Sequence, residues 1–166
     1  MTKTAFISLG SNLKRDNKLS LKENLEIILL TFPENNIFVK KISNWYESEP
    51  VPLSNQTWFI NAVVKVSTNT SPEELLYKLH EIEKFFGRKR SILNASRTID
   101  LDLIDFQGLI KNDSLILPHP RMHLRLFVLL PLQDIEPNWV HPVLKQSIKE
   151  LITNYTSDQK IRKVYF

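Results

Sequence analysis

The sequence predicts an α+β protein with a ferredoxin-like β-α-β-β-α-β core, in which helices pack on a mostly antiparallel sheet, followed by C-terminal helical additions. The first observation behind this prediction is the order of the segments, since strand-like and helix-like periodicities follow one another in that order. The second is a pair of well-marked helix starts between the strand segments. The 166 residues contain no repeat, low-complexity tract or linker, so we expect one domain over residues 1–166.

The expected elements follow one another along the whole chain. In chain order they are a strand over residues 4–9, a turn at 10–12, a helix over 21–32, strands over 37–46 and 58–66, a helix over 72–86, a strand over 98–106, a turn at 107–108, a short apolar segment at 115–117, a helix over 120–131, a helix over 145–154, and a terminal strand or tail over 161–166.

Start and stop signals define the two core helices. Ser20 and Glu23 form a capping box at the start of the first helix, and Pro33 ends it. Ser71 precedes Pro72, and an N-cap followed by proline at the first helical position is typical of a helix start. The apolar residues of both helices recur at helical spacing, which predicts that each helix packs one face on a core.

The strand segments are rich in β-branched and aromatic residues or alternate in polarity. Residues 47–56 lie between two of these segments and contain Pro50 and Pro52, which exclude regular structure. A loop between two strands can close over a ligand.

Two aspartates occur in the strand expected over residues 98–106. Asp100 and Asp102 are two positions apart, and alternate residues of a strand project from the same face, so their carboxylates should be close neighbours. Close like charges favour a bound cation, and Mg²⁺ prefers oxygen ligands, which makes both residues candidate metal ligands. Taken alone, a half-buried strand with a solvated acidic edge is the more frequent explanation of such a pattern.

A basic loop immediately precedes this strand and contains Arg88, Lys89, Arg90 and Arg97. In polyphosphate chemistry, metal ions bridge phosphate oxygens and guanidinium groups neutralise the charge that develops on them. The loop and the aspartates together therefore indicate phosphoryl transfer. The alternative is that the basic residues only complement the C-terminus of the preceding helix.

Composition limits the class of protein. The chain has no cysteine, which excludes a disulfide framework, thiolate catalysis and the usual structural zinc sites, and which suits a reducing compartment. It contains no apolar signal segment and no run of about 20 apolar residues, so we expect a cytoplasmic protein without a membrane partner. The formal net charge of +4 favours an anionic partner, either a nucleotide or a nucleic acid.

Glycine usage excludes two common nucleotide sites. Only Gly10, Gly87 and Gly108 are present, so neither a P-loop nor a Rossmann fingerprint can form. Any nucleotide phosphates must therefore be held by side chains and metal.

Aromatic side chains are candidates for binding a planar heterocycle. Trp45, Phe59 and Phe127 could offer flat apolar faces, and the Asn61 amide could pair with donors and acceptors on a ring edge. Plain core packing is the alternative for each of the aromatic residues.

Five motifs in one order along the chain carry a resemblance to a known family. They are Gly10-Ser11-Asn12; Tyr46-x-Ser48-x-Pro50 with Phe59-x-Asn61; Gly87-Arg88-Lys89-Arg90; Arg97-Thr98-Ile99-Asp100-Leu101-Asp102; and Pro118-His119-Pro120-Arg121-Met122. Across essentially its whole length, the sequence resembles the 6-hydroxymethyl-7,8-dihydropterin pyrophosphokinases of folate biosynthesis. The last two motifs are specific to that family, whereas Gly-Ser-Asn is common.

The resemblance implies a single pyrophosphokinase domain over residues 1–166. From one catalytic domain and no appended segment we expect a monofunctional, monomeric enzyme without a nucleic-acid partner. It implies transfer of the terminal pyrophosphoryl group of ATP, the co-substrate, to the hydroxymethyl oxygen of 6-hydroxymethyl-7,8-dihydropterin, with release of AMP. Two Mg²⁺ ions held by Asp100 and Asp102 would clamp the triphosphate and lower the pKa of the attacking hydroxyl.

The family's functional residues carry over to matching positions of this sequence. The implied catalytic residues are Arg88, Arg97, Asp100 and Asp102. The implied ATP-binding residues are His80, Arg88, Arg90, Arg97, Ile116, His119, His123 and Arg125. The implied pterin-binding residues are Ser48, Pro50, Val51, Phe59, Asn61, Asp100 and Phe127, with the two phenylalanines on either side of the ring. Glu83, one helical turn before the arginine loop, matches a further position of the same site.

The sequence departs from the family pattern in the basic loop. Many members have Trp-Gly-Pro where this chain has Asn94-Ala95-Ser96, which removes an aromatic side chain that could help to cover the closed site. Phe59 replaces a frequent tyrosine, which keeps the stacking face and loses a hydroxyl. These differences concern closure of the loop and leave the metal-binding aspartates unchanged.

Two other classes of protein share some of these features. An RNA-binding ferredoxin-like module would suit the element order and the basic charge, but residues 58–63 lack the glycine and aromatic pattern of RNP1. Without metal, an exposed acidic pair also repels a phosphate backbone. The second is another metal-dependent nucleotide transferase, since nucleotidyltransferases combine Gly-Ser with two aspartates. There the aspartates follow Gly-Ser closely, whereas here a helix, two strands and a second helix intervene.

Overall fold

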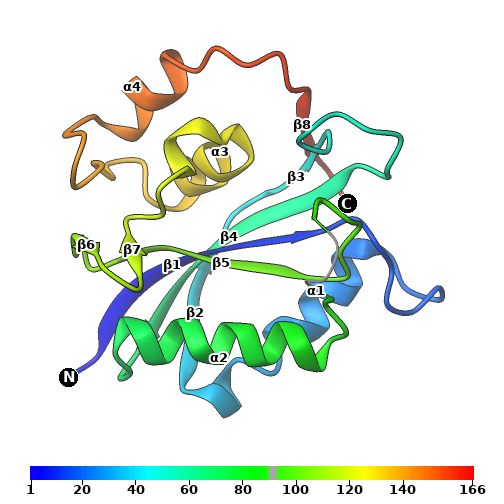
Figure 1. Ribbon diagram of the computed structural model, residues 1–166, viewed down its shortest axis with the longest axis horizontal. Helices are drawn as coiled ribbons and strands as arrows, with labels where there is room; N and C mark the ends of the chain where they lie inside the picture. Colours follow the sequence, from blue (N-terminus) through cyan, green and yellow to red (C-terminus); the bar gives the residue numbers. More distant parts are fainter. Residues whose placement is uncertain (90–92) are drawn as a thin grey trace.

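The computed structural model describes residues 1–89 and 93–166, and within them the main feature is a six-stranded sheet with helices on both faces (Figure 1). Its strands are β1 (Lys3–Ser11), β2 (Ile37–Ile42), β3 (Trp45–Ser48), β4 (Phe59–Thr68), β5 (Asp100–Phe106) and β8 (Ile161–Val164). The helices are α1 (Leu21–Leu29), α2 (Pro72–Phe85), α3 (Leu126–Ile135) and α4 (Ile148–Thr153), with 3₁₀-helices at Pro33–Asn35 and Met122–Leu124. A separate two-stranded ribbon consists of β6 (Lys111–Asn112) and β7 (Ile116–Leu117).

The sheet confirms the predicted fold class. Its strand order is β5-β1-β4-β3-β8, with β2 also on β4, and its neighbouring strands are antiparallel. The prediction of a single strand over residues 37–46 is wrong in one respect, because two separate strands, β2 and β3, occupy this segment. At the break, the Ser43 hydroxyl accepts a hydrogen bond from the Val63 backbone N–H at 2.9 Å. A side chain thus replaces a backbone acceptor and interrupts the ladder.

The helices cover both faces of the sheet. Figure 1 shows α1 and α2 on one face and α3 and α4 on the other. The first face buries Leu25 and Leu79 with Ile7 of β1, and the second buries Leu129 with Phe6 of the same strand. Neighbouring residues of a strand project to opposite faces, so β1 contributes to both cores.

The third helix differs from its predicted range of residues 120–131. Met122–Leu124 form a 3₁₀-helix, and α3 starts only after it and continues through Pro131. Proline has no N–H for an intrahelical hydrogen bond. The helix continues nevertheless because one of its faces is buried in the core, where Leu129 and Leu132 are 0% exposed.

The last helix and the last strand have clearer bounds than the sequence predicted. α4 is shorter than the helix expected over residues 145–154, because Ser147 and Glu150 form a capping box that fixes its start. β8 pairs with β3 along the sheet edge, so the strand is the correct choice for residues 161–164. Across residues 1–89 and 93–166, none of the helices combines the length and the apolar character that crossing a membrane requires.

Candidate active site

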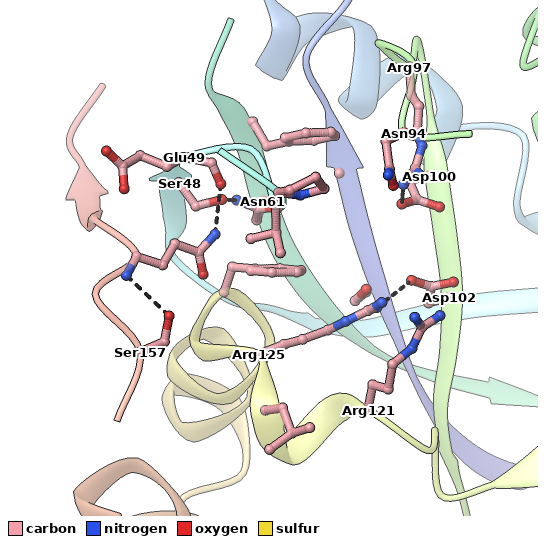
Figure 2. A pocket seen from close by; sticks show the side chains of 18 of the residues that line it. Ser48, Glu49, Asn61, Asn94, Arg97, Asp100, Asp102, Arg121, Arg125 and Ser157 are labelled. Atoms are coloured by element: carbon pink, nitrogen blue, oxygen red, sulfur yellow. Dashed lines mark hydrogen bonds and ion pairs between the residues drawn. The ribbon is translucent and has the colours of Figure 1, made fainter. Parts of the chain in front are cut away.

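A cavity of about 450 Å³ opens at one end of the central strands β1, β4 and β5 (Figure 2). Gly10 pairs with Asn61 on one side and with Asp100 on the other, so the three residues form a row across the sheet. β1 therefore continues through Gly10, and the turn predicted at residues 10–12 is wrong for this position. A β-carbon on Gly10 would lie 3.4 Å from Asn61 Oδ1 and 3.8 Å from Asp100 Cβ, so glycine keeps the space between these side chains open.

The acidic pair lies on β5, and both of its residues, Asp100 and Asp102, line the cavity. Arg88 and Arg97 bind different carboxylate oxygens of Asp100, and the contact of Arg97 measures 2.7 Å. Arg125 reaches Asp102 Oδ2 at 3.4 Å, as Figure 2 shows. Three arginines named by the sequence thus converge on the two aspartates.

The two carboxylates differ in their electrostatic environment. Burial raises the pKa of Asp100, but the charges and hydrogen bonds of Arg88 and Arg97 outweigh it and hold that pKa below its ordinary value. Burial and then the charge of Asp100 raise the pKa of Asp102 to about 6, and the charge of Arg125 offsets them only in part. Asp102 is therefore the carboxylate with the greater need for a further cation.

Glu83 fixes the position of one of these arginines. Its side chain is 1% exposed, although it belongs to the otherwise amphipathic helix α2. Glu83 Oε1 accepts hydrogen bonds from Arg88 at 3.0 Å and from the Leu101 backbone N–H at 2.8 Å. The carboxylate thus joins α2 to β5 and holds the Arg88 guanidinium beside the acidic pair. Helical periodicity assigns charged residues to the solvent face, so it could not identify this buried group.

The other side of the cavity is apolar and suits a flat ring. Phe59 of β4 and Phe127 of α3 both line it. Asn61 is 4% exposed and donates from Nδ2 to Ser48 Oγ at 2.8 Å, so its Oδ1 atom is the one available to a ligand. Trp45 belongs to the hydrophobic core, and core packing is the correct explanation for that residue.

Asn12 connects the loops around the cavity. Its side chain donates to Gln56 Oε1 and to the Thr57 carbonyl, each at 3.1 Å. Its Oδ1 atom accepts from the Arg97 backbone N–H at 2.8 Å, and Gln56 Nε2 donates to the Asn94 carbonyl at 2.8 Å. The loop before β4 is thereby tied to the arginine loop. Gln56 lies in a proline-rich loop, and sequence reasoning gave no signal for its role.

A second cavity of about 260 Å³ shares both aspartates with the first, and His119 lines it. Burial, followed by the charges of Arg125 and Arg121, lowers the pKa of His119 to about 4, so this imidazole is neutral at neutral pH. His119 Nδ1 accepts from the Arg121 backbone N–H at 3.2 Å. In a neutral imidazole the proton is then on Nε2, which is a donor for an anionic ligand.

Arg121 is a site residue that sequence reasoning missed, although it belongs to a quoted motif. It lines both cavities, and Figure 2 shows its side chain directed toward Asp102. Within residues 1–89 and 93–166, the Arg121 side chain forms no ion pair. It is thus a cation at the junction of the cavities that remains available to an anionic ligand.

Five predicted site residues are not among the described residues that line the two cavities. Among the described lining residues of both cavities, His80, Ile116 and His123 do not occur. Pro50 is buried between two residues that do line the larger cavity. Arg90 lies outside the residues that the structure describes. Substrate contacts of these five residues stay predictions.

The residues present suit a magnesium ion as part of a substrate complex. No cluster of three or more His, Cys, Asp or Glu side chains able to hold a metal occurs among the described residues. Asp100 and Asp102 supply hard oxygen ligands but not a complete coordination sphere. Mg²⁺ is commonly bound by one or two carboxylates together with waters and substrate phosphates, and the pair fits that mode.

Comparisons with known proteins match the chain to one family and to several relatives. Residues 6–137 match the model of a family described as 7,8-dihydro-6-hydroxymethylpterin-pyrophosphokinase (HPPK). The chain is 35% identical over 161 residues to the 2-amino-4-hydroxy-6-hydroxymethyldihydropteridine pyrophosphokinase of Haemophilus influenzae, across 96% of this chain and 97% of that protein. It is 37% identical over 162 residues to the folic acid synthesis protein FOL1 of Dictyostelium discoideum, across 96% of this chain and 23% of that protein. The chain therefore spans less than a quarter of the length of this second relative.

A solved structure has a similar fold. It is the crystal structure of Plasmodium falciparum HPPK-DHPS A437G with STZ-DHP, which matches with a TM-score of 0.69 at 17% identity. The match covers 92% of this chain and 45% of that chain. At this identity the likeness concerns the fold alone.

Proposed function

The chain belongs to the 7,8-dihydro-6-hydroxymethylpterin-pyrophosphokinase family, and on this premise we propose that it transfers pyrophosphate from ATP to 6-hydroxymethyl-7,8-dihydropterin in folate biosynthesis. The row of Asn61, Gly10 and Asp100 carries the proposal, because it joins an apolar ring-binding side and an acidic phosphate-binding side within one cavity. A heterocycle on the first side would direct its hydroxymethyl group toward the second.

In the proposed reaction the hydroxymethyl oxygen forms a bond to the β-phosphorus of ATP. The bond from that phosphorus to the oxygen that bridges the α-phosphorus breaks, and AMP leaves with this oxygen. The hydroxyl proton passes to solvent. The pterin keeps the β- and γ-phosphoryl groups as a diphosphate ester.

Asp100 and Asp102 would hold two Mg²⁺ ions together with oxygens of the triphosphate. Bound there, the ions would neutralise phosphate charge and lower the pKa of the attacking hydroxyl. The raised pKa of Asp102 supports this assignment, because burial and the charge of Asp100 disfavour its carboxylate and the charge of Arg125 offsets them only in part.

The arginines would neutralise the phosphate groups. We propose that Arg88 and Arg97 exchange their contacts with Asp100 for contacts with phosphate oxygens when the substrate complex forms. Glu83 would keep Arg88 in place, since it binds that guanidinium independently of Asp100. The further nucleotide contacts that we propose are those of His80, Arg90, Ile116, His119, His123 and Arg125.

The pterin would bind on the apolar side of the cavity. Phe59 and Phe127 would stack on the two faces of the ring. The Asn61 Oδ1 atom would accept a hydrogen bond from an N–H on the ring edge, because the Nδ2 atom is already bonded to Ser48. The backbone from Ser48 through Pro50 to Val51 would complete the recognition of the edge.

We further propose a cytoplasmic monomer in which residues 1–166 act as one pyrophosphokinase domain without nucleic acid. The absence of cysteine suits a reducing compartment. Without bound metal, the acidic pair would repel a nucleic-acid backbone.

Analysis of the nucleotide products tests the proposal. The purified protein is incubated with ATP, Mg²⁺ and the pterin, and controls omit the pterin or the metal. AMP that forms only in the complete mixture supports the proposed reaction. ADP would indicate transfer of a single phosphoryl group, released pyrophosphate would indicate nucleotidyl transfer, and either product would refute it.

A further inference from the structure

Residues 155–160 connect α4 to β8 and cross the end of the larger cavity, and we call them the C-terminal strap. Tyr155, Ser157 and Gln159 line the cavity, so alternate residues of the strap face it. Figure 2 shows Ser157 and Glu49 at one end of the cavity and the acidic pair at the other. The strap therefore closes the ring-binding side, away from the phosphate-binding side.

Three hydrogen bonds join the C-terminal strap to Glu49. Gln159 Nε2 donates to the Glu49 carbonyl at 2.7 Å. The Glu49 N–H donates to the Lys160 carbonyl at 3.1 Å, and the Lys160 N–H donates to Glu49 Oε2 at 2.7 Å. Two of the bonds use the backbone of Lys160, whereas the first depends on the side chain of Gln159 alone.

Glu49 stands between the residues that we propose to recognise the ring edge. On one side is Ser48, whose hydroxyl accepts from Asn61 at 2.8 Å, and on the other is Pro50. Because proline has no N–H, the Glu49 carbonyl is the only hydrogen-bonding group of the peptide unit that joins Glu49 to Pro50. The bond from Gln159 therefore sets the orientation of that peptide unit.

We propose that Gln159 is a positioning residue for the pterin, acting through Glu49, and that the C-terminal strap forms the end wall of the ring-binding slot. This inference rests on the proposed function, since it names the ring that the wall meets. Tyr155 contributes by donating from its hydroxyl to Gln159 Oε1 at 3.4 Å, which restrains the amide that holds Glu49. The backbone edge that recognises the ring thus keeps its shape through contacts from the far end of the chain.

Steady-state kinetics of Gln159→Leu test the inference, because leucine keeps the size and removes the donor. We expect the KM for the pterin to rise about fivefold to tenfold, the effect of one lost hydrogen bond, with kcat and the KM for ATP changed by less than about twofold. Calorimetric titration of 6-hydroxymethylpterin, with a non-hydrolysable ATP analogue present, should show the same loss in affinity. Gln159→Glu places a carboxylate against the Glu49 carbonyl and should raise the KM for the pterin further.

Lys160→Ala is the matched control, because Lys160 contacts Glu49 only through its backbone. We expect wild-type kinetics from Lys160→Ala, and similar Tm values for the wild type and all three variants.

An unchanged KM for the pterin in both Gln159 variants, with an active wild type, would overturn the inference and leave the proposed function intact. An equal rise in both KM values with a fall in Tm would also overturn it, since that result describes a merely structural role. A wild type that neither binds the pterin nor forms AMP would refute the proposed function itself, and the inference with it.

Discussion

Replacement of Asp102 by asparagine should stabilise the ligand-free protein while it abolishes the proposed activity. The pKa of Asp102 is raised to about 6 because the carboxyl is partly buried and lies beside the charge of Asp100. Above that pH the folded state holds an unfavourable charge that the unfolded state exposes to water. Asparagine has nearly the same shape and carries no charge, so Asp102→Asn removes the penalty.

The size of the effect follows from the pKa. A rise from 3.8 to about 6 corresponds to at most about 3 kcal/mol of unfolding free energy. The Asp102 side chain is 31% exposed and its contact with Arg125 would be lost, so we expect a net gain of about 1 to 2 kcal/mol. For 166 residues this is a rise of about 2 to 8 °C in Tm at pH 7.5. The gain should shrink as the pH falls through 6 and vanish below about 4, where Asp102 is protonated in the folded and unfolded states alike.

Asp100→Asn is the matched control, two positions earlier on β5. Arg88 and Arg97 hold the pKa of Asp100 low, so the loss of its charge removes favourable contacts and should lower Tm at pH 7.5. Differential scanning fluorimetry from pH 4 to pH 8 measures all three proteins. A lower Tm for Asp102→Asn than for the wild type at pH 7.5 would refute the electrostatic reasoning. Neither variant should form AMP.

Three further substitutions test other parts of the site through AMP formation and thermal unfolding. Glu83→Gln weakens the contact that fixes Arg88 and should lower kcat about tenfold or more; an unchanged kcat would mean that Arg88 needs no such support. Gly10→Ala places a β-carbon 3.4 Å from Asn61 Oδ1 and should raise the KM for the pterin about fivefold. An equal rise in the KM for ATP would contradict the placement of the pterin beside Gly10. Arg121→Ala removes a cation that has no ion-pair partner among the described residues and should raise the KM for ATP about fivefold. The Tm of Arg121→Ala should equal that of the wild type, and a marked fall in Tm would indicate a structural role for Arg121 instead.

Local sequence patterns were sufficient for the fold class and for the centre of the site. The alternation of residues 98–104 predicted that Asp100 and Asp102 share a face of a strand, and both line one cavity from β5. The N-cap Ser71 correctly marked the start of α2, because capping depends on residues that are close in sequence. Arg88 and Arg97 were found for the same reason, since their loop immediately precedes the strand that carries the acidic pair, whereas Arg125 was identified only through the family resemblance.

Features that depend on contacts between distant residues could not be predicted from local patterns, and Glu83 was identified only through the family resemblance. Glu83 follows the spacing of an ordinary helix, and only the packing of α2 against β5 turns it into a buried carboxylate. Gln159 lies 110 positions from Glu49, and no local pattern links them. The break between β2 and β3 likewise depends on a hydrogen bond between Ser43 and Val63, 20 positions apart. In each case one polar side chain forms a hydrogen bond with a residue that is distant in the sequence and becomes a neighbour only in the folded chain.

The ³¹P NMR spectrum of the pterin product tests pyrophosphoryl transfer most directly. The reaction is run with ATP, Mg²⁺ and 6-hydroxymethyl-7,8-dihydropterin, and the pterin is separated from the nucleotides. We predict two mutually coupled phosphorus resonances on the pterin, as in a diphosphate ester, together with AMP in equal amount. A single phosphorus on the pterin, or an adenylyl group attached to it, would contradict attack at the β-phosphorus and the function proposed for this chain.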